Sequence, residues 1–444
     1  MSTATQWQAK LITACSPERN ITWWDECYID LPVQVTLRGV ERSVVVVGGP
    51  QSGKTIAIKA FERAEQGRLF MVHYPVDRWY GEVNAWLPGT ENHLSQIMAC
   101  AAVEVRNFIS RHADKLDDFK LTELNLEYLR WLIKKHSSKR TFSRWADSLT
   151  YEPLLQLMSE PFEDIYPDAT VLNDAQGQIE ELVTLSRRLG FEGIAVLVDT
   201  TEADLNTDSR SDKVADLFSW LIPLQFEGFA IKAAIPQAVV EQTNLLTIPR
   251  DRVTFAFLDW RLEDCLKLAD KSLTVATSGQ IKKFTALANS PLQATIIDHL
   301  FTLYDHMSPQ IWTQLLEVLL QHVQQPGSPL GPDNADEILH DYYAKYVPLK
   351  IDETAQGVWR GKTFLKLDPQ PFGFLQILWH YRDSLDDPDR ELLKLAGGSD
   401  KRGNMNTIAS RLRNKIEPVP KMPVYVQNNR IRGYWLENTI AIET

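Results

Sequence analysis

The fold of this chain is decided by the stretch Val44-Val45-Val46-Val47-Gly48-Gly49-Pro50-Gln51-Ser52-Gly53-Lys54-Thr55. Four consecutive valines are typical of a buried strand, the pattern G-x-x-x-x-G-K-T follows them, and Ile56–Glu62 continues as a helix. A strand, a glycine-rich turn and a helix N-terminus in this order form the context of a phosphate-binding loop. The stretch therefore predicts an α/β fold in which a parallel sheet carries this loop.

The chemistry of the loop indicates nucleotide binding. Glycines let the backbone turn its N–H groups toward phosphate oxygens, and the helix N-terminus adds the positive end of its dipole. Lys54 is expected to reach the β- and γ-phosphates, and the Thr55 hydroxyl to hold Mg²⁺. The alternative is a glycine turn that only joins a strand to a helix. We predict ATP and Mg²⁺ as cofactors, and contacts with the nucleotide from Gly48, Gly49, Pro50, Gln51, Ser52, Gly53, Lys54, Thr55 and Ile56.

A second motif ends at residue 199. The stretch Gly193-Ile194-Ala195-Val196-Leu197-Val198-Asp199 is apolar up to its final acid, which is the Walker B form of a buried strand. Asp199 is therefore predicted to be a metal ligand together with Thr55, and a catalytic residue together with Lys54. We predict that Glu202 orients the attacking water. Asp204 is a weaker rival for that role, and the alternative for Glu202 is a solvated loop acid.

Three more polar residues flank later strands. Gln237 follows the apolar stretch 229–235, where a residue that senses the γ-phosphate is expected, although a loop glutamine needs no such role. Arg250 and Arg252 precede the apolar stretch 253–258. They are candidates to stabilise phosphate charge in this or a neighbouring subunit, and surface arginines are the alternative.

The order of these segments predicts how the chain divides into domains and linkers. We expect a P-loop core over residues 1–258 with a helical insertion at about 77–174. A helical lid is expected over 259–324, and a linker with a connecting helix over 325–355. Prolines and glycines exclude regular structure from 325–332. A separate α+β module is expected over 356–444.

Composition narrows the class of protein. With 444 residues, 44% of them hydrophobic, the chain is long enough for two or three domains. No apolar stretch reaches membrane-spanning length, the N-terminus lacks a signal-peptide pattern, and the four cysteines lie far apart. We therefore expect a cytoplasmic protein without membrane association. The net charge of −11 argues against uniform nucleic-acid affinity, so local charge has to be considered separately.

The residues from about 21 to 322 resemble the AAA+ and STAND branch of P-loop ATPases. The resemblance rests on the Walker A stretch, the later Walker B strand and the trailing helical lid, and it implies a homo-oligomer that forms with nucleotide. Two positions depart from the usual pattern. The acid that follows Asp199 is three positions later, at Glu202, rather than adjacent, and Gln310 stands where such lids often carry an arginine. Both departures favour a switch with slow turnover over a motor.

The C-terminal residues, from about 358 to 437, resemble the winged helix-turn-helix domain of OmpR-type response regulators. The resemblance rests on the strand and helix of Phe364–Leu378, on the stretch N-T-I-A-S-R-L-R-N-K-I at Asn406–Ile416, and on a terminal hairpin that ends in R-G-Y-W-L at Arg432–Leu436. It implies a recognition helix and a wing that bind duplex DNA.

The physical character of these residues agrees with DNA binding. Ile408, Leu412 and Ile416 recur at every fourth position and predict one apolar helix face. From Asp400 to Trp435 there are eight basic residues and two acidic ones, a net of about six positive charges that suits a polyanion. The alternative is a winged helix that docks a protein. We predict DNA contacts from Thr407, Ser410, Arg411, Arg413, Asn414, Lys415, Arg430 and Arg432.

Together these features predict a prokaryotic regulator, a switch ATPase that couples its nucleotide state to DNA binding. Two alternatives stay open. One is an initiator- or transposition-type ATPase that assembles on DNA, and the other is a signalling or phage-defence ATPase whose winged helix binds a partner protein.

Overall fold

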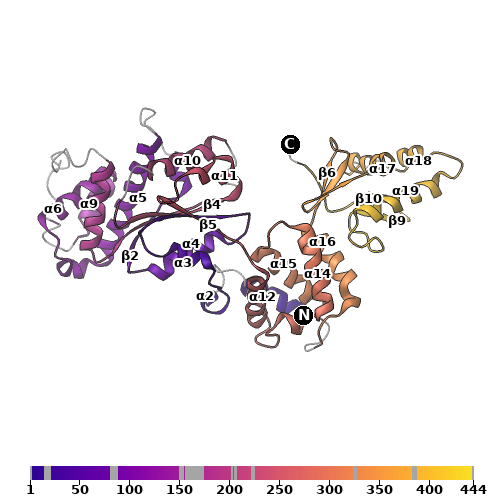
Figure 1. The fold of residues 1–444 in the computed structure, drawn as a ribbon, viewed down its shortest axis with the longest axis horizontal. Coiled ribbons are helices and arrows are strands. Elements are labelled where there is room, and N and C mark those ends of the chain that lie inside the picture. Colours follow the sequence, from indigo (N-terminus) through magenta and orange to yellow (C-terminus); the bar gives the residue numbers. More distant parts are fainter. Residues whose placement is uncertain are drawn as a thin grey trace. The chain divides into compact units, whose positions relative to one another are not determined.

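The computed structural model describes residues 3–14, 22–80, 89–149, 155, 175–201, 204, 208–221, 226–323, 328–382 and 388–442 (Figure 1). The chain divides into two compact units. One is Asp30–Asp259, and the other combines Met1–Ile29 with Trp260–Thr444.

The unit Asp30–Asp259 is built around a five-stranded sheet in which all strands are parallel. The strand order is β2-β3-β4-β1-β5. All residues of β1 and β4 are buried because helices cover both faces of the sheet, which also explains their continuous apolar sequences. The predicted α/β class with a parallel sheet is confirmed. The strands are β1 (Ser43–Gly48), β2 (Leu69–His73), β3 (Gly193–Asp199), β4 (Phe229–Pro236) and β5 (Val253–Phe257).

The helices of this unit lie on two sides of the sheet (Figure 1). Helices α3 (Pro32–Leu37) and α4 (Lys54–Glu65) pack on one face. Helices α5 (Gly89–Arg111), α10 (Asp208–Leu221) and α11 (Gln237–Gln242) lie on the other. The sheet thus forms the middle layer, and the carboxyl ends of its strands meet at one edge.

The described part of the region expected as a helical insertion consists of helices joined by short turns. After the 3₁₀ segment η1 (Val76–Tyr80) and α5, it contains η2 (Ala113–Phe119), α6 (Glu123–Lys135) and α7 (Lys139–Ala146), and α9 (Ala175–Arg188) returns the chain to β3. The Thr122 side chain accepts a hydrogen bond from the Asn125 amide, and the Asn125 side chain accepts one from the Thr122 amide. This capping box sets the start of α6. No described helix is both long enough and apolar enough to cross a membrane.

The second unit begins with the N-terminal helix α1 (Thr3–Ala14), which packs on α12 (Leu262–Ala276) and α15 (Pro309–His322). Trp7 and Leu11 are buried in the same apolar cluster as α12, α14 (Ser290–Leu303) and α15, which belong to the region expected as a helical lid and are called the lid helices below. The sheet-bearing unit therefore starts at Asp30, whereas the sequence division began the core at residue 1. The sequence of a short amphipathic helix shows which face is apolar but not which partner covers that face.

The remaining segments before residue 347 are α2 (Trp23–Glu26), η3 (Leu245–Thr247, in the sheet unit), α13 (Phe284–Leu287), η4 (Pro332–Asn334) and α16 (Ala335–Tyr346).

The C-terminal module combines a four-stranded sheet, three helices and a hairpin. The sheet has the order β11-β6-β7-β8 and begins at Leu349, before the expected start at 356. Helices α17, α18 and α19 pack on one another, and β9 pairs with β10 as an antiparallel hairpin. The bounds are β6 (Leu349–Asp352), β7 (Gly357–Arg360), β8 (Thr363–Lys366), α17 (Pro369–His380), α18 (Asp389–Ala396), α19 (Lys401–Ile416), β9 (Val426–Asn429), β10 (Gly433–Leu436) and β11 (Thr439–Ala441).

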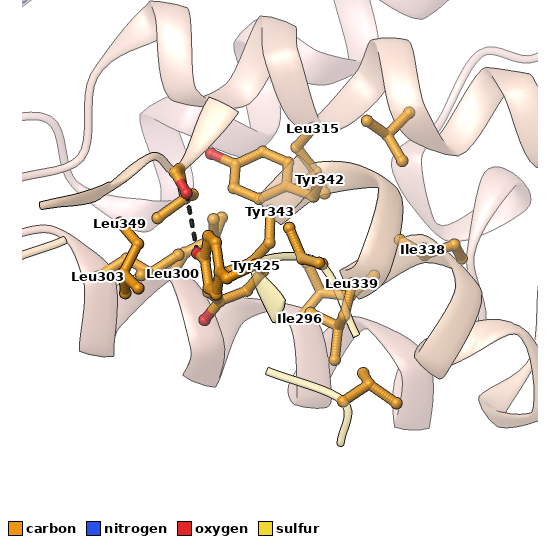
Figure 2. Close-up of a cluster of buried hydrophobic side chains, with 14 of the residues drawn as sticks. Ile296, Leu300, Leu303, Leu315, Ile338, Leu339, Tyr342, Tyr343, Leu349 and Tyr425 are labelled. Carbon is orange, nitrogen blue, oxygen red and sulfur yellow. Dashed lines mark hydrogen bonds between the residues drawn. The ribbon is translucent and has the colours of Figure 1, made fainter. Parts of the chain in front are cut away.

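One apolar core joins the lid helices to this module (Figure 2). Tyr343 of α16 and Tyr425, which precedes β9, lie close to Leu300 and Leu303 of α14 in that core. The Tyr425 hydroxyl donates a hydrogen bond to the Val347 carbonyl at 2.8 Å, so a buried polar group is satisfied. The helices and the module therefore share a packed interior.

The described residues of the proline- and glycine-rich stretch 325–332 make backbone hydrogen bonds to the helical region before it. Leu330 is buried, its amide donates to the Leu287 carbonyl at 2.9 Å, and its carbonyl accepts from the Asn289 amide at 2.9 Å. Residues 324–327 lie outside the described residues. The sequence predicts no regular structure in this stretch, and Leu330 forms an isolated β-bridge with Ala288 through these two hydrogen bonds.

Candidate functional site

The loop between β1 and α4 has the backbone conformation that an anion site requires. Gln51 and Gly53 have positive φ values of 56° and 94°, and Gly53 is the N-cap of α4. A side chain at Gly48 would meet the Ser52 Oγ at 2.4 Å, so the close approach of the loop requires glycine there. Left-handed residues beside a helix N-terminus make a concave group of amides that favours phosphate.

Lys54 is the first residue of α4, and its buried ammonium lies over this loop. The Nζ atom donates hydrogen bonds to the Gly48 carbonyl at 3.1 Å and to the Gly49 carbonyl at 2.8 Å. An ammonium at the start of a helix, above a loop of concave backbone amides, is placed to contact an anion that those amides bind. The position therefore fits the predicted contact with phosphate.

Thr55 and Asp199, which are 144 positions apart in the sequence, meet at the same edge of the sheet. The Thr55 hydroxyl donates to the Asp199 carboxylate, with Oγ1 and Oδ1 3.1 Å apart. Partial burial raises the pKa of Asp199, against the lowering effects of the Thr55 hydrogen bond and of the charges of Lys59 and Lys54. A hydroxyl and a carboxylate are the oxygen ligands that Mg²⁺ prefers, so this pair fits the predicted metal site.

Lys59 is a residue of this site that sequence reasoning missed. It lies on α4, one helical turn after Thr55, and its charge lowers the pKa of Asp199. The available signal was its i+4 spacing from Thr55, which places both side chains on one helix face.

The loop after β3 shows a structural role for Asp204. Its Oδ2 atom accepts hydrogen bonds from the Thr201 amide at 2.8 Å and from the Thr201 hydroxyl at 2.7 Å. The carboxylate thus closes a turn in this loop. Glu202 lies outside the described residues, and its predicted role in orienting water stays a prediction.

Gln237 lies at the same edge of the sheet as the phosphate loop. It follows Pro236, which pairs with Gly48 in the parallel register of β4 and β1. The side chain amide donates to Glu241 at 2.9 Å, one turn further along α11. Gln237 therefore lies where a residue that senses the γ-phosphate is expected, and that role of Gln237 stays a prediction.

Arg250 and Arg252 lie at the amino ends of the parallel strands, on the side of the sheet opposite to the phosphate loop. Arg252 precedes Val253, which pairs with Ser43 at the start of β1, and the phosphate loop begins at the other end of that strand. At 3.3 Å per residue, the length of β1 separates the two edges by roughly 16 Å. Arg252 also pairs with Asp251 at 3.7 Å. This placement disfavours a role at the loop of the same chain, and only the role in a neighbouring subunit stays a prediction.

The exposed face of α19 carries most of the residues predicted to bind DNA. Ile408, Leu412 and Ile416 are buried, as their spacing predicts, and Met405 and Ala409 are buried beside them. The Asp400 side chain caps the helix by accepting from the Gly403 amide at 2.9 Å. The exposed residues include Thr407, Ser410, Arg411, Asn414 and Lys415.

Arg413 differs from the other basic residues because it holds the hairpin. Its Nε donates to the Val426 carbonyl at 2.9 Å, its guanidinium donates to Asn428 at 3.2 Å, and it lies 5.6 Å from the Tyr434 ring centre. The half-buried side chain therefore connects α19 to β9. Arg430 and Arg432 are exposed at the tip of the hairpin.

Glu417 is another residue that sequence reasoning missed, and its role is structural. Its buried carboxylate accepts hydrogen bonds from the amides of Val424, Tyr425 and Val426 at 2.6–3.1 Å. These bonds fix the segment that leads from α19 into the hairpin. The available signal was an isolated acid in a strongly basic stretch.

Comparisons with known proteins assign no family. No protein-family model matches the chain, and no curated protein matches it.

Proposed function

We propose that this chain is an ATP-binding switch ATPase that couples its nucleotide state to the binding of duplex DNA. The nucleotide would lie at the carboxyl edge of the parallel sheet, and DNA would bind the C-terminal module, which we interpret as a winged helix. The two resemblances and the geometry of each surface support this proposal.

The observation that carries the nucleotide part is the hydrogen bond from Thr55 to Asp199 at 3.1 Å. It brings the end of the Walker A stretch and the end of the Walker B strand together beside a loop with left-handed residues. Thr55 and Asp199 would hold Mg²⁺, which would neutralise phosphate charge, and Lys54 would bind the phosphates through its ammonium. The loop amides would orient them.

The DNA part is supported by the order of elements in the C-terminal module. Helix α18, a turn with positive φ at Gly397 and Gly398, and helix α19 are followed by the β9–β10 hairpin. The exposed face of α19 bears hydroxyl, amide and basic side chains, which suit phosphates and base edges. In this interpretation α19 is the recognition helix and the hairpin is the wing.

Substitution Lys54→Ala tests the nucleotide part. The loss of one charge-assisted contact of about 1.5–3 kcal/mol should weaken ATP binding by roughly 10–150-fold. Titration calorimetry with Mg²⁺-ATP measures the effect, and Lys115→Ala, which removes an exposed lysine of the helical insertion, is the matched control. Equal ATP affinity of the Lys54→Ala variant and the parent would sink the proposal.

A further inference from the structure

The turn of the β9–β10 hairpin carries an apolar side chain that is almost fully exposed to solvent. Ile431 is 98% exposed, more than any other large hydrophobic side chain among the residues that the structure describes. The next values are 73% for Leu124 and 71% for Val35. An isolated exposed apolar residue needs no special explanation, but this one lies in the turn of the β9–β10 hairpin, which Arg413 connects to α19 (Figure 1 shows the hairpin).

The structure holds this tip in a defined conformation. The Asn429 side chain accepts hydrogen bonds from the Ile431 amide at 2.9 Å and from the Arg432 amide at 2.6 Å. Gly433 closes the turn with φ of +72°, and the hairpin is tied to α19 by Arg413. Ile431 is thus presented by an ordered turn, and little conformational entropy remains to be lost when it inserts into a partner.

The charges beside Ile431 indicate the kind of partner. Arg430 and Arg432 flank it, and the Arg432 guanidinium lies 5.1 Å from the Trp435 ring centre. Two arginines beside one apolar side chain suit a partner with negative charge on both sides of an apolar insertion point. The DNA minor groove concentrates negative potential that attracts arginine, and apolar side chains of this kind insert between its base steps and kink the duplex.

We propose that Ile431 is a wedge that inserts between adjacent base pairs from the minor groove and kinks the DNA. Arg430 and Arg432 contact the backbone or the groove on either side of the insertion. The inference rests on the DNA binding proposed above, and it adds that this wing deforms its target. The chain then favours duplexes that unstack easily, such as those with pyrimidine–purine steps.

The test measures bending and binding separately, with the full-length chain and a duplex of about 30 base pairs that carries a fluorophore at each end. The parent protein should raise energy transfer between the ends, consistent with a kink of roughly 20–90°. Ile431→Ala should lose most of this change and bind about tenfold more weakly, because insertion contributes to affinity. Ile431→Phe should keep the kink, and Leu124→Ala is the matched control for an exposed apolar residue in the other compact unit.

A duplex with a central mismatch gives an independent readout. The mismatch lowers the cost of unstacking, so the parent should bind it more tightly than the matched duplex, and Ile431→Ala should show no such preference. Binding without bending, or equal bending by Ile431→Ala, would overturn the wedge and leave DNA binding intact. An Ile431-dependent interaction with a protein, combined with unbent DNA, would assign the tip to protein docking. Absence of DNA binding by every form would overturn both proposals.

Discussion

His93 connects three elements of the sheet-bearing unit through one buried ring. It lies on α5 and is 0% exposed. Its Nε2 donates to the Lys213 carbonyl of α10 at 3.0 Å, and its Nδ1 lies 2.7 Å from the Tyr74 hydroxyl oxygen. In the neutral ring, Nδ1 accepts a hydrogen bond from the Tyr74 hydroxyl while Nε2 donates. Burial lowers the pKa of His93 to about 4.

This pKa predicts a loss of stability in acid. The unfolded chain binds a proton at this histidine near pH 6.5, whereas the folded chain does so only near pH 4. The contribution of His93 is therefore present above pH 6.5 and falls by about 1.4 kcal/mol per pH unit below it, to a total of about 3 kcal/mol. We expect the stability difference between the parent and His93→Gln to shrink as the pH falls from 7 to 4. Urea unfolding at each pH measures it.

The control for this experiment is His306→Gln, which changes an exposed histidine in the other compact unit. A difference between the parent and His93→Gln that stays constant from pH 7 to pH 4 would contradict the assignment of a neutral buried ring.

At the scale of elements, two arginines on α19 have different surroundings although only one residue separates them. Arg411 is exposed, whereas Arg413 donates to the Val426 carbonyl and to Asn428 of the hairpin. Each residue of a helix is rotated by about 100° from the one before, so Arg411 and Arg413 point about 160° apart, and one faces solvent while the other faces the wing. The first is available for phosphate or base contacts, and the second positions β9.

Substitution of each arginine should therefore have a distinct signature. Arg411→Ala should lower the salt slope of DNA binding by about one unit if it contacts phosphate. Arg413→Ala should leave two hairpin groups without their donor, at a stability cost of about 1–3 kcal/mol. DNA affinity across a salt series, together with thermal unfolding, separates the two effects. A larger loss of stability for Arg411→Ala than for Arg413→Ala would contradict these roles.

At the scale of the whole molecule, the lid helices and the C-terminal module form one packed body. The turn between β7 and β8 rests on the end of α14, where the Lys362 amide donates to the Leu303 carbonyl at 2.9 Å and the Thr363 hydroxyl donates to the Thr302 carbonyl at 3.0 Å. The Lys362 ammonium pairs with Asp305 at 3.3 Å. A movement of the lid helices would thus carry the module with it.

This packing provides one part of the coupling that we propose between ATP and DNA, the part that joins the helices of residues 259–324 to the module. A nucleotide that binds one arrangement of the lid more tightly should change DNA affinity by about 5–150-fold, and DNA should change ATP affinity by the same factor. DNA binding measured with an ATP analogue, with ADP and without nucleotide tests this expectation. Three equal affinities would mean that the nucleotide site and the module act independently.

Gly361→Ala probes that part of the coupling directly. An added Cβ would meet the Leu303 carbonyl oxygen at 2.4 Å, and the residue has a φ of +59°. The substitution should loosen the contact between the module and α14. The effect of nucleotide on DNA affinity should therefore become smaller, while the affinity for ATP alone and the affinity for DNA alone should change less. Gly279→Ala is the matched control, because it has a φ of +82° with open space around it.

The sequence alone predicted the β1 strand, the glycine-rich turn that follows it, the start of α4 and the buried face of α19. Local chemistry determines these features: four valines favour a strand, the loop glycines allow its conformation, and the spacing of Ile408, Leu412 and Ile416 sets the buried face of α19. The motif also located Lys54 and Thr55. Each of these signals lies within a few consecutive residues.

Only the tertiary structure decided which distant residues meet. It brought Thr55 to Asp199, placed Arg252 at the opposite edge of the sheet, turned Arg413 toward the hairpin and packed Trp7 with the lid helices. Each outcome depends on strand order, register or the choice between apolar faces, and these are set by the free energy of the whole core. A periodic sequence specifies that a face is buried, while the fold specifies what covers it.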